Sequence, residues 1–388
     1  MEEIADMFSN WNIVKLKDIC DIRNEKFNPK QNGNYKYIAL ENIIQGAGKL
    51  NSFGESANSL SIKSKFYKKD ILFGKLRPYL KKYLYAEFDG VCSTEIVVLN
   101  TKLGNDSLFN YYLIQQDEFI EYLSNKSFGT KMPRTSWEIM GDYKLLCPPL
   151  KEQEKIAFIF STVDELIINT DHLINSYSLL KKGLMHTLLT KGIGHTKFKM
   201  TEIGEIPEEW EVKKTGEICK SGRGRVISLK EIENKPGEYP VFSSQSKENG
   251  CIGYLNTYDF DGEYVTWTTD GVYAGTTFYR NGRFNCTNVC GTLKSNFKDI
   301  DIKYLSLALS RCIDKYVVKL GNSKLMNNIM EIIPVPIPND FEEQKKIGRI
   351  IQVIEDIINI NISKKKSIEV LKKGLMQQLL TGKIRVKV

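Results

Sequence analysis

The sequence predicts an α+β protein built as a tandem repeat, in which two mixed α/β domains alternate with two long helices. Two observations support this class. The segment LKKGLMHTLLT at 180–190 recurs as LKKGLMQQLLT at 371–381, with nine identities in eleven positions. KEQEKIA at 151–157 recurs as EEQKKIG at 342–348 in the same register, so Gln153 matches Gln344 and Gly183 matches Gly374. A constant register over this length indicates an internal duplication.

The repeat divides the 388 residues into four parts. We expect a first mixed domain at 1–149, a first helix at 150–192, a second mixed domain at 193–338 and a second helix at 339–388. The two mixed domains open alike, with WNIVKLKDIC at 11–20 and WEVKKTGEIC at 210–219, and then diverge. Divergence between two framed copies suggests that each domain binds something different.

Each long helix carries one apolar stripe. In the first helix, Ile156, Phe160 and Val163 begin a row with steps of three and four, which is the spacing of a coiled-coil seam, and the second helix repeats it from Ile347. About forty residues at about 1.5 Å each give a rod of about 60 Å, whose stripe needs a partner such as the other copy.

The ends and the glycines of these helices carry further signals. Asp340 and Glu343 form a candidate capping box, and Gly192 and Gly382 stand where a C-terminal glycine is expected. A glycine inside a helix costs about 0.5–1 kcal/mol relative to alanine. Because the glycine of the GLM motif is present in both copies, we expect another backbone to approach there, from the sister helix or from a partner subunit.

Composition excludes some classes. A net charge of +8 and a pI near 8.8 favour an anionic partner. No apolar run approaches the roughly 20 residues that cross a membrane, and the first ten residues do not resemble a signal peptide. The eight scattered cysteines are typical of free thiols in a cytoplasmic protein, and no metal site is expected, although Cys286 and Cys290 could supply two ligands.

The distinctive stretch of the first mixed domain is DILFGKLRPYLKKYLY at 70–85, where cations and aromatic residues alternate. This pattern suits phosphate contact with stacking or groove packing, but a solvated basic face over an aromatic core explains it equally well. We expect strands at 35–40 and 95–99, a helix at 108–123, and a polar loop at 129–134.

The second mixed domain opens with the glycine-rich basic loop SGRGR at 221–225, which is either a phosphate contact or a plain turn. Its middle reads as β-hairpins with turns at Asp270-Gly271 and Asn281-Gly282. The loop at 321–324 stands where GTKM stands at 129–132, at an offset of 192 residues.

Motifs for catalysis are missing. The sequence has no Walker loop, no glycine-rich nucleotide-binding motif and no HExxH. CPPL at 147–150 has neither the Asp or Asn before the prolines nor the aromatic residue after them that an amino-methyltransferase motif needs. The repeated frame therefore favours binding over turnover, and we expect no catalytic residues.

The whole chain resembles the specificity subunit of type I restriction–modification systems. The resemblance rests on IGEIPEEW at 203–210, on DILFGKLRPYL with CSTE at 92–95, on YAG at 273–275 with TNVC at 287–290, and on the repeated QEKI and GLM motifs of the helices. It implies that each mixed domain is a target-recognition domain that reads one half of a split site in double-stranded DNA. It also implies that the two helices pack antiparallel as a coiled coil and space the two halves.

The resemblance also implies partners and leaves this subunit without a bound cofactor. Two methyltransferase subunits would dock on the helices and supply S-adenosylmethionine chemistry, and restriction subunits would add ATP- and Mg²⁺-dependent cleavage. The DNA-binding candidates are Lys75, Arg77, Tyr79, Lys81, Thr130, Lys131, Arg134, Arg223, Arg225, Tyr273, Arg280, Arg283, Asn322, Ser323 and Lys324. The partner-binding candidates are Gln153, Gly183, Gln344 and Gly374.

Two alternatives come from other classes. An autonomous DNA-cleaving enzyme would show metal-dependent cleavage by the purified chain. A coiled-coil scaffold that binds proteins would show no salt-dependent DNA affinity, whereas a DNA-binding protein loses affinity steeply as salt rises.

Overall fold

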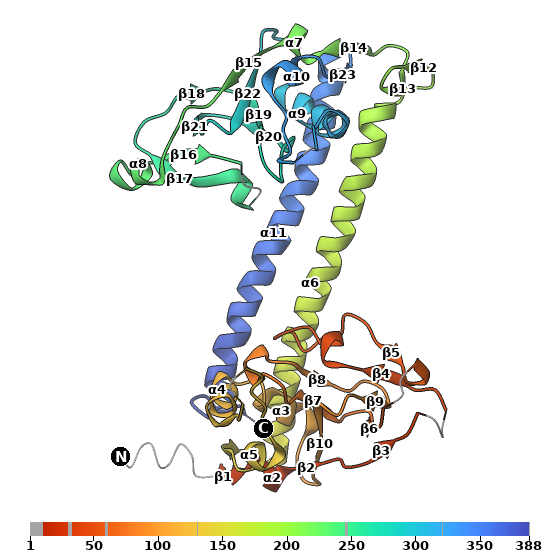
Figure 1. Ribbon diagram of the computed structural model, residues 1–388, viewed down its shortest axis with the longest axis vertical. Coiled ribbons are helices and arrows are strands. Elements are labelled where there is room, and N and C mark those ends of the chain that lie inside the picture. The colour runs from red at the N-terminus through yellow and green to blue at the C-terminus, as the bar shows by residue number, and fades with distance from the viewer. Residues whose placement is uncertain are drawn as a thin grey trace. The chain divides into compact units, whose positions relative to one another are not determined.

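The computed structural model describes residues 11–29, 33–58, 61–129, 131–244, 247–319 and 321–387. The chain forms two compact units (Figure 1). Unit 1 comprises 1–171 and 363–388, and unit 2 comprises 172–362. The division runs through both long helices, so that each unit combines one α/β domain with half of each helix.

Unit 1 contains two sheets and a short strand pair. The four-stranded sheet has the order β2 (Cys20–Ile22), β10 (Ile96–Thr101), β7 (Ile71–Gly74), β8 (Tyr83–Tyr85). The five-stranded sheet has the order β3 (Lys26–Phe27), β6 (Lys63–Phe66), β9 (Gly90–Cys92), β4 (Lys36–Ile38), β5 (Gly54–Glu55). β1 (Asn12–Lys15) pairs antiparallel with β11 (Lys144–Cys147). The helices are α2 (Leu16–Ile19), α3 (Ser107–Leu113), α4 (Asp117–Lys126) and α5 (Trp137–Gly141), with 3-10 turns at Leu40–Asn42, Ser56–Asn58 and Pro78–Leu80.

Unit 2 has a similar plan, with a second short strand pair and one strand fewer in one sheet. One four-stranded sheet has the order β15 (Cys219–Arg223), β22 (Cys290–Ser295), β19 (Tyr264–Thr268), β20 (Thr277–Arg280). The other has the order β17 (Cys251–Leu255), β16 (Tyr239–Phe242), β21 (Arg283–Cys286), β18 (Phe260–Asp261). β12 (Phe198–Thr201) pairs with β13 (Gly204–Pro207), and β14 (Glu211–Lys214) pairs with β23 (Pro334–Ile337). The helices are α7 (Thr215–Ile218), α8 (Leu229–Asn234), α9 (Ile302–Cys312) and α10 (Asn327–Glu331), with 3-10 turns at Lys247–Gly250 and Ile313–Lys315.

Register shows that the duplication continues into the divergent domains. Ile96 pairs with Gly74 between β10 and β7, and Cys290 pairs with Thr268 between β22 and β19, each residue lying 194 positions from its equivalent. Each unit also contains a parallel strand pair, which is β4 with β9 in unit 1 and β16 with β21 in unit 2. Two divergent sequences thus share the four-stranded sheet and the parallel strand pair, although the second sheet has five strands in unit 1 and four in unit 2, and this confirms the predicted tandem repeat of two mixed domains.

The long helices are α6 (Leu150–Lys191) and α11 (Phe341–Leu379). They run antiparallel in each unit, because contacts at higher residue numbers of α6 reach lower residue numbers of α11. Unit 1 has Asp164 with Lys372 at 2.7 Å and Asp171 with Lys365 at 2.6 Å, and unit 2 has Lys181 with Glu355 at 2.7 Å. In unit 2 the amide of Ile193, just past α6, donates to the Glu343 carboxylate at 2.8 Å, twelve residues from the contact made by Lys181. The first helix ends one residue before its predicted limit, whereas α11 ends nine residues before the end of the predicted segment.

Buried residues of these helices join the core of each domain. Phe160 belongs to the core of unit 1, and Ile347 and Ile351 belong to that of unit 2. Leu173 and Leu180, which continue the predicted seam, are exposed instead. The apolar row of the helices is therefore buried where they pack against a domain and exposed at Leu173 and Leu180. Gly192 and Gly382 both have a positive φ, as expected for residues that end a helix.

Three local predictions are wrong. Asp340 caps α11 through its carboxylate, but the Glu343 side chain binds Trp210 and His195 instead of completing a capping box. Asn281-Gly282 does not close a hairpin, because β20 and β21, on either side of it, belong to different sheets. The predicted helix 108–123 is two helices, α3 and α4.

Candidate nucleic-acid interface

The basic stretch of the first domain forms a tight loop between β7 and β8. Arg77 and Lys81 both adopt the left-handed conformation, with φ of 52° and 49°, on either side of the 3-10 turn. A non-glycine residue in this region carries strain of order 1–3 kcal/mol and is enriched at functional sites. Tyr79, at the tip, is 49% exposed, whereas Tyr83 is buried in the core. The predicted stretch of cations and aromatic residues therefore has two parts, which are a loop tip at the surface with Tyr79 and a buried strand with Tyr83.

A second loop closes against the first. Phe128 and Arg134 exchange backbone hydrogen bonds of 3.1 and 3.0 Å, which pinch off the segment between them. The Arg77 amide donates to the Pro133 carbonyl at 2.7 Å, so the two loops are held together by their main chains. Lys131 is exposed within the pinched loop, and Thr130 lies outside the described residues. The structure thus brings together four of the predicted residues, which are Arg77, Tyr79, Lys131 and Arg134.

Charge at this loop pair is only partly compensated. Arg134 Nε lies 3.0 Å from the carboxylate of Glu95. One terminal nitrogen of Arg77 donates to the Lys131 carbonyl at 3.4 Å, while its Nε is buried and finds no hydrogen-bond partner in the described part of the chain. Lys75 and Arg134 line a groove of about 310 Å³ between the β2–β3 connection and the start of α5. Lys81 differs, because its ammonium turns to Asp117 on α4.

The second domain repeats this construction with other side chains. Gly271 and Gly275, with φ of 95° and 90°, stand 194 residues after Arg77 and Lys81 and adopt the same left-handed conformation. Tyr273 stands 194 residues after Tyr79 and is 46% exposed.

The pinched loop is repeated too. Val318 and Lys324 exchange backbone hydrogen bonds of 3.0 Å, and the Gly271 amide donates to the Ser323 carbonyl at 3.0 Å. Asn322 is exposed in this loop, as is Lys324. The pinched loops thus match at an offset of 190 residues, from Arg134 to Lys324, which corrects the offset of 192 expected from sequence.

One of the second domain's arginines joins this loop pair. Arg223, at the end of β15, donates to the Asn288 carbonyl at 2.6 Å and lies 3.4 Å from the carboxylate of Asp270. Asp270 itself forms a β-bridge with Lys324. One surface therefore carries Arg223, Tyr273, Ser323 and Lys324. We call this surface the second loop pair. Residues 75–81 together with 128–134 form the first loop pair.

The other predicted arginines lie elsewhere. Arg225 is held by Glu231 and Asp259, and Arg283 by Asp261. Arg280 is 8% exposed and stacks 3.5 Å over the Phe242 ring. Burial lowers the pKa of its guanidinium to about 10. The prediction of Arg280 as a DNA-binding residue is therefore wrong, since its side chain is enclosed within the domain.

Apolar side chains at the loop pairs were missed by sequence reasoning. Phe128 and Val318, which close the two pinched loops, are both exposed, as are Met132 and Val272. Lys26 also lines the groove of the first domain. Exposed apolar residues in a strained loop are a signal of recognition that only a structure can supply, because a sequence does not show which apolar residues miss the core.

The four predicted partner-binding residues separate into two kinds. Gln153 and Gln344 are each 1% exposed, and their side-chain oxygens accept from the backbone amides of Asp106 and Asp301, both at 2.9 Å. Their amide groups donate to the Pro148 and Pro338 carbonyls at 2.8 and 2.9 Å. These glutamines tie each helix to its own domain, and the structure leaves them no surface for a partner.

The two glycines lie on the surface. Gly183 on α6 and Gly374 on α11 are exposed, and a Cβ atom at either position would meet no atom within 4 Å beyond its own helix turn. Large apolar residues stand beside both, with Leu179 73% and Val370 68% exposed. We call 179–183 and 370–374 the helix patches. The sister helix does not approach these glycines in either unit, which removes one of the two explanations for them.

Two other findings bear on function. No helix of the described residues is long and apolar enough to cross a membrane. Within the same residues, no group of three or more His, Cys, Asp or Glu side chains is placed to hold a metal ion.

Comparisons with known proteins agree with this architecture. The family model "Type I restriction modification DNA specificity domain" matches 8–176 and again 207–371. A type I specificity subunit of Mycoplasma pneumoniae is 37% identical over 223 residues, which cover 57% of this chain and 84% of the relative. The type I restriction enzyme MjaVIII specificity subunit of Methanocaldococcus jannaschii is 28% identical over 328 residues, covering 77% and 75%. The crystal structure of a type I restriction–modification S subunit from M. genitalium has the same fold, with a TM-score of 0.63, 18% identity and 96% of both chains covered.

Proposed function

The chain belongs to the type I restriction–modification DNA specificity family, and we propose that its two loop pairs read the two halves of one split target in double-stranded DNA. The observation that carries this proposal is the likeness of the loop pairs in backbone and their difference in side chains. Arg77 and Lys81 stand in the first where Gly271 and Gly275 stand in the second. One frame that presents two different sets of side chains can recognise two different base sequences.

Each loop pair combines the groups that DNA recognition uses. Arg77, Lys131 and Arg134 supply positive charge for phosphates in the first domain, and Arg223 and Lys324 do so in the second. Tyr79 and Tyr273 extend from the loop tips with a ring and a hydroxyl, which can pack in a groove and hydrogen-bond to base edges. Phosphate contacts position the domain, and the residues that differ between the tips supply the sequence preference.

The helix patches fit a second role, which is docking of methyltransferase subunits. Each unit carries one patch, on α11 in unit 1 and on α6 in unit 2. A glycine flanked by exposed apolar residues lets a partner helix approach the backbone closely. Two equal patches would hold two methyltransferase subunits, one for each target half.

Chemistry would then come from the partners, acting in the cytoplasm. The methyltransferase subunits would supply adenine methylation from S-adenosylmethionine, and restriction subunits would supply ATP- and Mg²⁺-dependent cleavage. The relatives of this chain are named specificity subunits, which supports a role in recognition without catalysis. An autonomous nuclease remains the opposing hypothesis, and cleavage of DNA by the purified chain with Mg²⁺ would establish it.

The test is to map methylated adenines in cells that express this chain with its methyltransferase. We expect a split motif with a fixed gap, absent when the chain is deleted. Tyr79→Ala should relax one half of the motif and Tyr273→Ala the other half. Arg225→Ala is the matched control, because Arg225 is exposed but lies outside the loop pairs. Methylation that persists unchanged without the chain would refute the proposal.

A further inference from the structure

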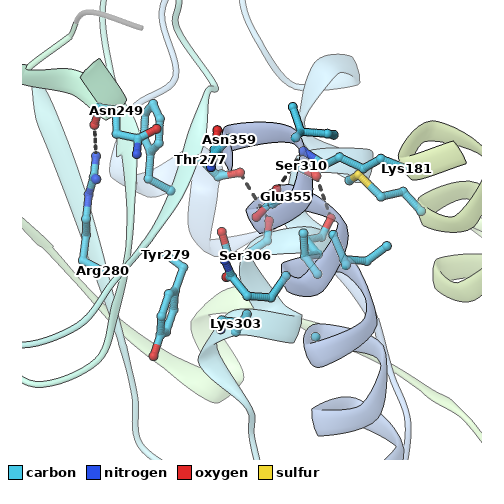
Figure 2. A pocket seen from close by; sticks show the side chains of 17 residues that line it. Lys181, Asn249, Thr277, Tyr279, Arg280, Lys303, Ser306, Ser310, Glu355 and Asn359 are labelled. Atoms are coloured by element: carbon cyan, nitrogen blue, oxygen red, sulfur yellow. Dashed lines mark hydrogen bonds and ion pairs between the residues drawn. The ribbon is translucent and has the colours of Figure 1, made fainter. Parts of the chain in front are cut away.

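A cavity of about 560 Å³ lies within unit 2, among β20, α9, α11 and the last turns of α6. Figure 2 shows Thr277 and Ser306 at its edge, where the Thr277 hydroxyl donates to the Ser306 carbonyl at 3.3 Å. The ion pair between Lys181 on α6 and Glu355 on α11 lies beyond them. The Tyr279 ring lies on the β20 side, and the ammonium of Lys303 stands 5.0 Å from its centroid. The volume is within the range of pockets that bind small ligands.

Aromatic rings fill the corresponding space in unit 1. Tyr83, Tyr111, Tyr112 and Phe160 are all buried there. Their ring centroids follow one another at 6.1, 5.4 and 4.9 Å, so they form a continuous row from β8 through α3 to α6. This row occupies the junction between the sheet and the long helices.

The equivalence of the two junctions is fixed by backbone landmarks. Asp106 and Asp301 cap α3 and α9, and each accepts the amide three residues ahead at 2.7 Å. Tyr85 pairs with Ile71 as Tyr279 pairs with Val265. Unit 2 has no aromatic residue at the four positions equivalent to this row. In place of Tyr83, Tyr111, Tyr112 and Phe160 it has Thr277, Ser306, Leu307 and Ile351, respectively.

Tyr112 makes polar contacts in unit 1, and unit 2 has equivalents of both residues that it contacts. The Tyr112 hydroxyl donates to Asp164 at 2.9 Å, and the ammonium of Lys372, which pairs with Asp164 at 2.7 Å, lies 5.4 Å from the ring centroid. Unit 2 keeps the same ion pair as Lys181 with Glu355, 191 residues away in each case. Leu307 places no ring and no hydroxyl beside that pair.

We propose that this cavity is a binding site for a phenolic ring, which takes the place that Tyr112 has in unit 1. The hydroxyl of the ligand donates to the Glu355 carboxylate, and the ring lies beneath the Lys181 ammonium and beside Tyr279. A hydroxyl, a flat apolar body and a nearby cation are the contacts that Tyr112 itself makes. The ring comes either from a tyrosine of an assembling subunit or from a free phenolic compound.

The probe is p-cresol, which is the tyrosine side chain as a free molecule, and toluene is its match without the hydroxyl. We expect saturable p-cresol binding to the full chain by NMR titration. Glu355→Gln should reduce the preference for p-cresol over toluene about tenfold, because a hydrogen bond to a charged group becomes a neutral one. Leu307→Tyr should abolish binding, since it supplies the missing ring from the chain itself.

Val353→Tyr is the control, because it adds a tyrosine at an exposed position of α11, the helix that carries Glu355, and should leave p-cresol binding unchanged. If the chain binds the methyltransferase as proposed above, loss of p-cresol binding in that complex assigns the site to a partner side chain, and retention assigns it to a free compound. No saturable binding to the full chain, or equal preference in the wild type and Glu355→Gln, would overturn the site and leave the DNA-recognition role untouched.

Discussion

Alanine in place of Gly183 and Gly374 separates the demands of folding from those of assembly. Both glycines lie inside a long helix, and an added methyl group would meet nothing in the chain beyond its own helix turn. A glycine inside a helix costs about 0.5–1 kcal/mol relative to alanine. Each substitution should therefore raise the unfolding free energy of its own unit by about that amount.

Assembly should change in the opposite direction. If a partner helix contacts these backbones, a methyl group on each patch separates the two surfaces. Native mass spectrometry of the chain mixed with its methyltransferase should show two bound subunits for the wild type. It should show one for either single variant and none for the double variant.

The control is Ser178→Ala on α6, whose exposed hydroxyl donates to the Ile174 carbonyl of its own helix. It too should stabilise the helix, by about 0.5 kcal/mol from helix propensity, without loss of a subunit. Urea unfolding followed by circular dichroism measures the stability of all variants. Stabilised glycine variants that still bind two subunits would refute the docking role of the patches.

Three further predictions concern the fold and the loops. Glu152→Gln should lower the unfolding free energy by about 1–3 kcal/mol at pH 7, because it breaks the pair with Arg385 at 2.7 Å. Burial opposes ionisation of Glu152, but hydrogen bonds from Arg385 and Trp11 outweigh it and lower the pKa of the carboxyl below its usual range. The ion pair thus stabilises fully above the unfolded-state pKa of about 4.3, and urea titrations should show the gap between variant and wild type closing as the pH falls through the folded pKa. Arg77→Gly should stabilise the first domain by about 1 kcal/mol in the same titrations while relaxing one half of the methylated motif, whereas Arg77→Ala should relax the motif without stabilising. Gly275→Ala should destabilise by more than Gly271→Ala in thermal unfolding, because its Cβ would lie 2.7 Å from Ile313 Cγ2 while that of Gly271 meets open space, and equal losses would contradict this packing.

The long helices could be predicted from sequence because their signal is local and occurs twice. Apolar spacing and flanking glycines place α6 to within one residue of its end. The predicted second helix is too long, since the chain leaves the helix after Leu379 and Arg385 returns to Glu152 in unit 1. That contact joins positions 233 residues apart, and no local pattern encodes it.

Strand partners could not be predicted in the same way. Asn281-Gly282 has the composition of a two-residue hairpin turn, and the chain does turn there. The strand before it pairs with β19, however, and the strand after it pairs with β18 and β16. Turn composition reports local backbone preference, whereas the choice of sheet depends on which buried face each strand completes.

The candidate site shows the same division between residue type and environment. Sequence identified the arginines of the second domain but could not show that Arg225 and Arg283 are held by carboxylates or that Arg280 is enclosed. Repetition is also ambiguous as evidence, because Gln153 and Gln344 are repeated for the fold, whereas a Cβ atom at Gly183 or Gly374 would meet nothing beyond its own helix turn.

The duplication separates what the fold requires from what each half recognises. Positions equivalent in both units keep a residue where the backbone depends on it, as the two glutamines do at the helix–domain junctions. At the loop tips both domains have a residue in the left-handed conformation, which is Arg77 in the first domain and Gly271 in the second. The conformation strains the arginine but not the glycine, so only the first domain carries this strain. Strain that stability does not favour persists where a side chain is needed at that place. Under the proposed DNA-recognition role, the strained arginine of the first domain is explained by a contact with DNA, which is why Arg77→Gly tests recognition more directly than the loss of any paired surface cation.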